Sequence, residues 1–190
     1  NIVNGDQLLA VLAIKMQRDG LLKNSTVVGT SMTNLAFDKW LNNIGIKLMR
    51  TDVGDRYISE AINQFNFSLG GEPSGHILVP HLSKTGDALM NALIILCEFV
   101  NEKKTSSKFF NKFNAIPQII HNIKGHGKNI LENNEIKAKI ASIIQSVQNE
   151  ARIIVRPSGT EKIIRIMVES NNKELIKTTI NRVENLLINY

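Results

Sequence analysis

The sequence predicts an α/β domain followed by a small α+β domain. Over residues 1 to about 103, short strand-like apolar runs alternate with helix-like runs, which is typical of a layered α/β domain. The polar stretch NEKKTSSK, residues 101–108, interrupts this pattern. Beyond it, the order strand, helix, strand, strand, helix predicts a domain whose helices cover one face of an antiparallel sheet.

The first domain is expected to begin and end with amphipathic helices. Residues 6–20 carry the helical period, with Asp6 as the expected N-cap and Gly20 as the C-terminal stop. Residues 85–104 predict a long helix with one apolar stripe, made of Leu89, Leu93, Leu96 and Val100. Between them we expect strands at 25–29, 46–51, 67–71 and 76–80, and helices at 31–45 and 55–65.

The second domain is expected to hold three strands and two long helices after a short helix at 107–113. Strands are predicted at 117–125, 151–155 and 162–168. Each long helix has an apolar residue at every third or fourth position, which indicates one buried face. These residues are Ile136, Ile140, Ile143 and Val147 in the first helix and Ile176, Ile180, Val183 and Leu187 in the second.

Composition excludes several classes of protein. The chain has 190 residues, of which 43% are apolar and 21% charged, as in ordinary folded domains. No run of about 18 apolar residues occurs, so we expect no membrane span. Cys97 is the only cysteine, so no disulfide can form within the chain; we expect it to be buried in its apolar helix. A cytoplasmic location fits this cysteine usage.

The net charge of +6 favours a small anionic ligand over nucleic acid. The basic residues are scattered along the chain, and aromatic residues, which would stack on bases, make up only 5% of it. A basic nucleic-acid-binding module remains the alternative from a different class. Its binding would fall steeply with salt, because condensed counterions are released.

The first loop of interest is RPSGTE, residues 156–161, between two strand-like runs. Arg156 offers a planar fork for a phosphate, and Ser158 and Thr160 add hydroxyl groups. Gly159 permits positive φ and close approach of the backbone, so successive N–H groups could form an anion nest. Arg165 in the next strand could turn toward the same site. Spacing alone leaves open whether this is a phosphate site or a solvated turn.

The second loop is GGEPSGH, residues 70–76, also between two strand candidates. The ionised Glu72 only accepts hydrogen bonds, which suits paired sugar hydroxyls, and Ser74 could donate or accept beside it. His76 could donate to a ligand oxygen or transfer a proton. The alternative is a glycine-rich turn with a solvated carboxylate.

A third stretch, TDVGDRY at residues 51–57, lies where a strand is expected to meet a helix. Asp55 is placed to cap that helix, and this role is favoured over chemistry. Arg56 in the first turn opposes the helix dipole, so a ligand phosphate or a neighbouring carboxylate is expected beside it.

These loops together resemble the α-D-phosphohexomutase family, most closely its members that act on glucosamine phosphates. RPSGTEKIIRIMVE resembles the family's phosphate-binding loop, GGEPSGH its sugar-binding loop, and NGDQLLAVLA, VGDRY and TGDAL further segments in the right order. The resemblance spans essentially the whole chain. It implies that residues 1–108 are the family's third domain, with a mixed sheet, and residues 109–190 its C-terminal domain, with a TATA-box-binding-protein-like fold.

The resemblance also implies a function. The family interconverts the 6-phosphate and 1-phosphate of a hexose through a phosphoserine enzyme and a bisphosphate intermediate. The members acting on glucosamine phosphates are cytoplasmic isomerases of carbohydrate metabolism that supply a cell-wall precursor. In such an enzyme Glu72, Ser74 and His76 would bind the sugar. The phosphate that is not transferred would be held by a second set of residues, namely Arg156, Ser158, Gly159, Thr160 and Arg165.

The chain departs from the family pattern in what it lacks. Neither the catalytic-serine loop nor the Asp-Gly-Asp-Gly-Asp-Arg loop that binds Mg²⁺ is present. We therefore expect the catalytic residues and the Mg²⁺ ligands in N-terminal domains outside this chain, and no turnover by the chain alone. The intact protein could form a homodimer. A piece of a longer protein and an inactive product of a truncated gene both remain open, as does specificity for glucosamine, mannose or glucose, since Pro73 departs from the glucosamine pattern.

Overall fold

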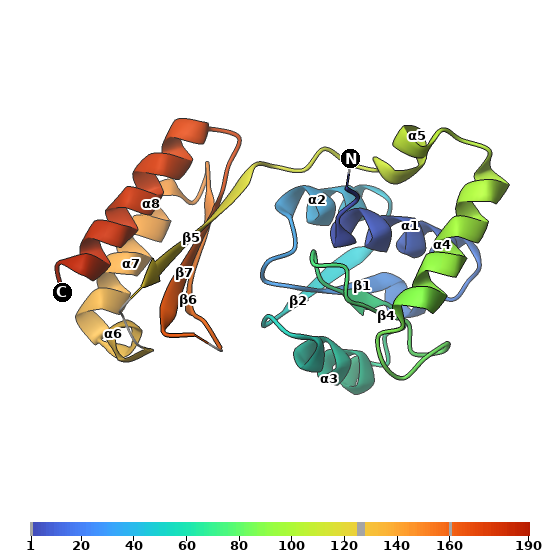
Figure 1. The fold of residues 1–190 in the computed structure, drawn as a ribbon, viewed down its shortest axis with the longest axis horizontal. Helices are drawn as coiled ribbons and strands as arrows, with labels where there is room; N and C mark the ends of the chain where they lie inside the picture. The colour runs from blue at the N-terminus through green and yellow to red at the C-terminus, as the bar shows by residue number, and fades with distance from the viewer. Residues whose placement is uncertain (1, 125–127, 160) are drawn as a thin grey trace. The chain divides into compact units, whose positions relative to one another are not determined.

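The computed structural model describes residues 2–124, 128–159 and 161–190, without the side chains of 128 and 129. The chain divides into two compact units, Asn1–Ala115 (unit 1) and Ile116–Tyr190 (unit 2) (Figure 1). This boundary lies seven residues beyond the expected one at 108. The reason is that Phe109 and Phe113, which follow the polar stretch, are buried in the core of unit 1.

Unit 1 is built on a mixed four-stranded sheet in the order β2-β1-β3-β4. Strand β1 runs parallel to both β2 and β3, whereas β4 is antiparallel to β3. The predicted α/β class with a mixed sheet is therefore confirmed. In chain order the elements are α1 (Gly5–Arg18), η1 (Lys23–Ser25), β1 (Thr26–Thr30), α2 (Leu35–Asn43), β2 (Lys47–Thr51), α3 (Asp55–Phe65), β3 (Gly70–Gly71), β4 (Ile77–Leu78), α4 (Ala88–Glu102) and α5 (Ser106–Phe110).

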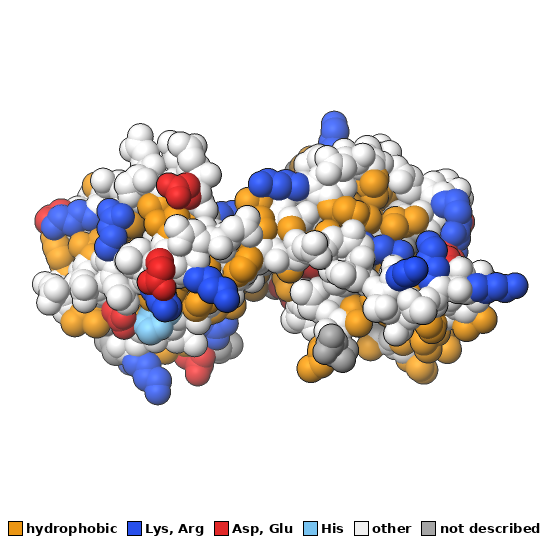
Figure 2. Space-filling view, turned by 90° about the horizontal axis from the view of Figure 1, so that it is seen from above, with side chains coloured by type: hydrophobic (Ala, Val, Ile, Leu, Met, Phe, Trp, Pro, Cys, Tyr) orange, Lys and Arg blue, Asp and Glu red, His pale blue; other side chains and the backbone are white. Residues whose placement is uncertain are grey.

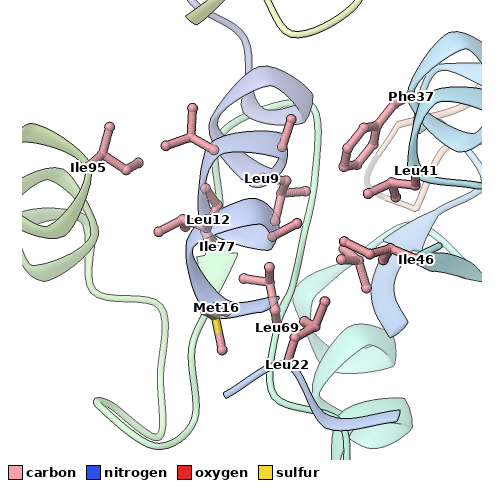
Figure 3. Close-up of a cluster of buried hydrophobic side chains, with 14 of the residues drawn as sticks. Leu9, Leu12, Met16, Leu22, Phe37, Leu41, Ile46, Leu69, Ile77 and Ile95 are labelled. Carbon is pink, nitrogen blue, oxygen red and sulfur yellow. The ribbon is translucent and has the colours of Figure 1, made fainter. Parts of the chain in front are cut away.

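Helices cover both faces of this sheet. Val27 and Val28 are neighbours on β1, so their side chains point to opposite faces. Val27 belongs to the larger core, which α1, α2, α4 and α5 complete, and Val28 belongs to a smaller core with Ile58 and Ile62 of α3. Figure 3 shows the larger core, in which side chains from α1, α2 and α4 meet those of the sheet.

An ion pair between the exposed Arg18 and the buried Glu98 joins α1 to α4. Both terminal nitrogens of Arg18 donate to Glu98, at 2.5 and 3.0 Å. The side chain of Glu98 is only 5% exposed, so leaving it unpaired would be costly. The hydrogen bonds from Arg18 hold the pKa of Glu98 below its ordinary value. This ion pair thus links α1 and α4, which pack on the same face of the sheet.

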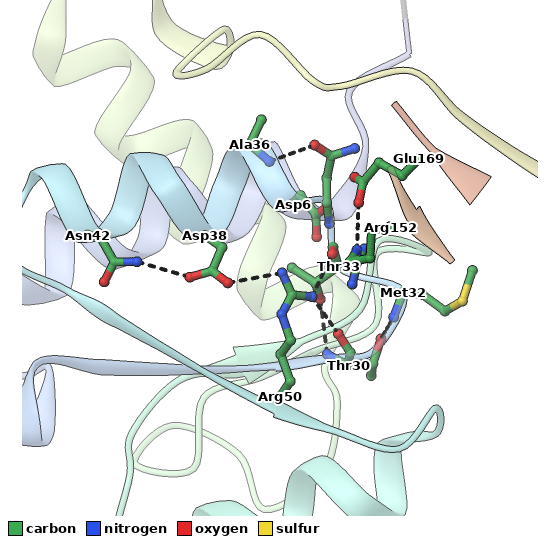
Figure 4. A network of polar contacts seen from close by, with 11 residues as sticks. Asp6, Thr30, Met32, Thr33, Ala36, Asp38, Asn42, Arg50, Arg152 and Glu169 are labelled. Carbon is green, nitrogen blue, oxygen red and sulfur yellow. Dashed lines mark hydrogen bonds and ion pairs between the residues drawn. The ribbon is translucent and has the colours of Figure 1, made fainter. Parts of the chain in front are cut away.

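The expectation that Asp6 caps α1 is wrong. Asn4, not Asp6, caps α1, because its Oδ1 accepts from the backbone N–H of Gln7 at 3.1 Å. Asp6 is instead buried, and its Oδ2 accepts from the backbone N–H of Asn34 at 2.9 Å. This contact joins the start of α1 to the loop between β1 and α2. Arg50 also secures that loop, since its Nη1 donates to the carbonyl of Thr33 at 2.7 Å (Figure 4).

The apolar stripe of α4 does not face the core of unit 1. Its four residues are 52–72% exposed, namely Leu89, Leu93, Leu96 and Val100. The helix buries the opposite side, through Asn91, Ile95 and Glu98. Cys97 shares the outer side and is exposed, which corrects the expectation that it is buried. The helical period therefore correctly predicts that these residues share one side of α4. That side is exposed and does not pack against the core of unit 1.

Unit 2 is a three-stranded antiparallel sheet in the order β5-β7-β6, packed against two helices. One core joins α7 and α8 to Ile164, Ile166 and Val168 of β7, so both helices lie on the same face, as predicted. The elements are β5 (Gln118–Lys124), α6 (Lys128–Glu132), α7 (Asn134–Val147), β6 (Arg152–Pro157), β7 (Ile163–Glu169) and α8 (Lys173–Ile188). Among the described residues of the whole chain, no helix is long and apolar enough to cross a membrane.

Candidate functional site

The GGEPSGH segment, which we call the sugar loop (Gly70–His76), closes the hairpin between β3 and β4. The backbone N–H of Glu72 donates to the carbonyl of His76, and that of Gly75 donates to the carbonyl of Glu72, both at 2.9 Å. Gly75 has φ of +97°, which favours glycine at this turn. Ser74 and His76 are exposed, and Glu72 is partly so. The loop thus presents all three expected sugar-binding residues from one tight turn.

The start of α3 contacts two of these three residues. The backbone N–H of Gly54 donates to Oε1 of Glu72 at 3.1 Å, and Oδ2 of Asp55 lies 3.6 Å from Nε2 of His76. Gly54 is the residue at the N-cap and makes no side-chain cap, so the expectation that Asp55 caps α3 is wrong. Arg56 pairs with Glu60 at 2.7 Å, and this neighbouring carboxylate accounts for its place in the first turn.

Two further glycines lie directly against the sugar loop. The backbone N–H of Gly5 donates to the carbonyl of Pro73 at 2.9 Å, and a Cβ at Gly5 would lie 2.0 Å from the carbonyl oxygen of Glu72. A Cβ at Gly86 would lie 2.6 Å from Nε2 of His76. The glycines of three Gly-Asp pairs, at 5–6, 54–55 and 86–87, therefore meet at one loop. Sequence reasoning missed this convergence, although the repeated pair was visible.

The RPSGTE segment, which we call the phosphate loop (Arg156–Glu161), begins with the last two residues of β6 and continues into the turn before β7. The backbone N–H of Ser158 donates to the carbonyl of Ile163 at 2.9 Å and closes the hairpin, so it is already used within the turn. Ser158 is 4% exposed. Gly159 is exposed, has open space around the position of a Cβ, and does not adopt the positive φ that glycine permits. Thr160 lies outside the described residues.

Arg156 and Arg165 lie directly opposite each other in the register of β6 and β7. Their side chains share the face away from the helices, because Ile164 and Ile166, the neighbours of Arg165, point into the core. Like charges in such a pair repel each other. Arg165 contacts Glu161 at 3.4 Å, yet among the described residues its Nε is buried without a hydrogen-bond partner. An anion between these two guanidinium groups would offset the repulsion.

Outside these two loops, the described residues present no comparable candidate binding site. On the face that Figure 2 shows, Lys and Arg side chains are spread over both units rather than gathered in one patch. His121 pairs with Glu184 at 2.8 Å and joins β5 to α8. Within the described ranges, no three His, Cys, Asp or Glu residues are grouped so that they could hold a metal ion.

Comparison with known proteins places both units in one class. The model of "Phosphoglucomutase/phosphomannomutase, alpha/beta/alpha domain III" matches residues 4–115, and the model of the same family's C-terminal domain matches residues 121–186. The chain belongs to the phosphoglucomutase/phosphomannomutase family, and these matches confirm the resemblance noted in its sequence.

Its curated relatives carry a more particular name. The chain is 40% identical over 178 residues to phosphoglucosamine mutase of Bartonella quintana, a match that covers 94% of the chain and 39% of that relative. It is 36% identical over 182 residues to phosphoglucosamine mutase of Zymomonas mobilis, covering 96% of the chain and 41% of the relative. The chain thus spans about two fifths of the length of these relatives.

Solved structures agree on the fold. Aspergillus fumigatus N-acetylphosphoglucosamine mutase, in complex with GlcNAc-6P and magnesium, matches with a TM-score of 0.81 at 17% identity, over 98% of this chain and 44% of that chain. A putative phosphomannomutase from Thermus thermophilus matches with a TM-score of 0.60 at 16% identity, over 98% of this chain and 41% of that chain.

Proposed function

We propose that this chain is the substrate-binding part of a phosphoglucosamine mutase, which interconverts glucosamine 6-phosphate and glucosamine 1-phosphate. The observation that carries the proposal is the 36–40% identity to phosphoglucosamine mutases over nearly the whole chain. The residue types of the GGEPSGH and RPSGTE segments support it. In this proposal Glu72 and Ser74 bind sugar hydroxyls and His76 lies beside them. Arg156 and Arg165 bind the phosphate that is not being transferred.

The turn residues of the phosphate loop have narrower roles in this proposal. The amide of Ser158 is engaged with Ile163, so its hydroxyl is the group left for a ligand. Gly159 leaves room for a phosphate to approach the backbone, and Thr160 would add a second hydroxyl. Such a site holds the substrate and neutralises its charge, which is most of what a protein contributes to phosphoryl transfer.

The phosphoserine and Mg²⁺ belong, in this proposal, to N-terminal domains of the longer protein. The described residues do not fit Mg²⁺, because they include no suitable cluster of acidic side chains. We assign no step through the metal to this chain. A cytoplasmic location and a homodimer of the intact protein are further parts of the proposal.

A phosphomannomutase or phosphoglucomutase is the second candidate. The family description names both activities, and the T. thermophilus structure is described as a putative phosphomannomutase. Pro73 in the sugar loop departs from the glucosamine pattern. Competition among glucosamine, mannose and glucose 6-phosphates for the chain would separate these candidates.

We expect no mutase turnover from the 190-residue chain supplied with glucosamine 6-phosphate, Mg²⁺ and a hexose bisphosphate. The reason is that the chain contains no phosphoserine loop to deliver a phosphoryl group. A coupled assay for glucosamine 1-phosphate checks this, with the full-length B. quintana enzyme as the positive control. Turnover above background by the purified chain would falsify the proposed division of roles.

A further inference from the structure

The sugar loop is held by a neighbouring segment that has no assigned role in binding. Val53–Asp55, which we call the VGD segment, links β2 to α3 and contacts two of the three proposed sugar-binding residues. We propose that Asp55 is a positioning residue. Together with the amide of Gly54 it forms what we call the clamp, which holds His76 and Glu72 in the orientations that select a hexose. This inference rests on the proposed function of the sugar loop.

The first half of the clamp acts on Glu72. The N–H of Gly54 donates to one oxygen of this carboxylate, Oε1, at 3.1 Å. It lies at the N-terminus of α3, where backbone N–H groups lack helical partners and the helix dipole favours negative charge. An ionised carboxylate has about four acceptor positions, so one such bond orients Glu72 and leaves capacity for two sugar hydroxyls.

The second half of the clamp acts on His76. Oδ2 of Asp55 lies 3.6 Å from Nε2 of the ring, and Gly86 lies against the same edge, so that a Cβ there would require the ring to move. Among the described contacts of Asp55, Oδ1 accepts from the backbone N–H of Arg56 at 2.8 Å, while the guanidinium of Arg56 pairs with Glu60. The carboxylate is therefore oriented on one side by its own helix and faces the imidazole with the other oxygen.

Asp55 is well suited to a test because little of the fold depends on it. Its side chain is 63% exposed, and α3 has no side-chain cap to lose. Surface substitutions of this kind usually change the free energy of unfolding very little. A change in sugar binding in an Asp55 variant would thus report on positioning rather than on folding.

The test uses Asp55→Asn in the 190-residue chain, with amide and His76 ring signals followed by NMR during titrations. One titration uses glucosamine 6-phosphate and the other uses inorganic phosphate. We expect the dissociation constant for the phosphosugar to rise roughly two- to fivefold, as for loss of a weak exposed polar contact, with inorganic phosphate binding unchanged. Asp52→Asn is the control, because it removes the same charge from an exposed neighbour.

Each result decides the inference. If Asp55→Asn binds the phosphosugar as the parent does, or loses inorganic phosphate equally, the positioning role is overturned. If the parent binds no phosphosugar, the proposed function fails in the isolated chain, and the clamp is decided on the ligand-free protein. In the ligand-free protein, His76 ring signals that change in Asp55→Asn but not in Asp52→Asn support the clamp. Ring signals that stay unchanged in Asp55→Asn overturn it.

Discussion

Replacing Arg156 by alanine is expected to weaken binding of glucosamine 6-phosphate to the chain by at least about tenfold. A charge-assisted hydrogen bond contributes roughly 1.5–3 kcal/mol, and Arg156 can make two to one phosphate. The loss should be the same for inorganic phosphate, because this residue is proposed to bind the phosphate rather than the sugar. Isothermal titration calorimetry with both ligands measures the effect.

The stability of the ligand-free Arg156→Ala variant shows whether a loss of affinity comes from binding or from unfolding. Arg156 lies opposite Arg165, so alanine removes a like-charge contact across the hairpin. We therefore expect the ligand-free variant to remain folded while its affinity falls, and thermal unfolding checks this. Lys162→Ala, at an exposed position of the same turn, is the control and should change neither much. Unchanged affinity in Arg156→Ala would contradict the phosphate site.

Replacing Gly5 by alanine is expected to disturb the sugar loop and destabilise unit 1. The new Cβ would lie 2.0 Å from the carbonyl oxygen of Glu72 and 2.7 Å from the backbone nitrogen of Gly75. Both are backbone atoms, so the loop must move as a whole, and overpacking of this kind costs about 1–3 kcal/mol. Thermal unfolding gives the loss of stability, and amide shifts across residues 71–77 report the displacement.

Gly159→Ala is the matched control for Gly5→Ala. The same methyl group enters open space there, with no positive φ to strain the backbone, so the free energy of unfolding should stay within about 0.5 kcal/mol. A Gly5→Ala variant that matched the parent in both stability and sugar-loop shifts would show that Gly5 does not support the loop.

The elements of the fold were largely predictable because each leaves a local signal. Helix α3 occupies Asp55–Phe65, the range predicted from its period. Helix α4 shows the limit of this reasoning. Its period grouped Leu89, Leu93 and Leu96 on one side, yet the core is packed by Ile95 on the other. Periodicity identifies residues that share a face and does not say which surface covers that face.

The candidate site was predictable only in part, for a similar reason. The two loops could be identified because their residue types suit sugar hydroxyls and phosphate. Their supports could not, since Gly5, Gly54 and Gly86 are far apart in sequence and meet only through the tertiary fold. The sequence also suggested that backbone N–H groups around Ser158 could form an anion nest. The N–H of Ser158 instead donates to the carbonyl of Ile163 and closes the hairpin.

The most direct test of the central claim, that this chain binds a hexosamine phosphate through these two loops, is an amide NMR titration of the 190-residue chain with glucosamine 6-phosphate. Glucose 6-phosphate and mannose 6-phosphate are titrated in parallel. We predict saturable shifts at residues 72–76 and 156–160, with those of the phosphate loop lost in Arg156→Ala. A well-dispersed spectrum in which these residues do not shift, or in which the shifts lie elsewhere, would contradict the claim.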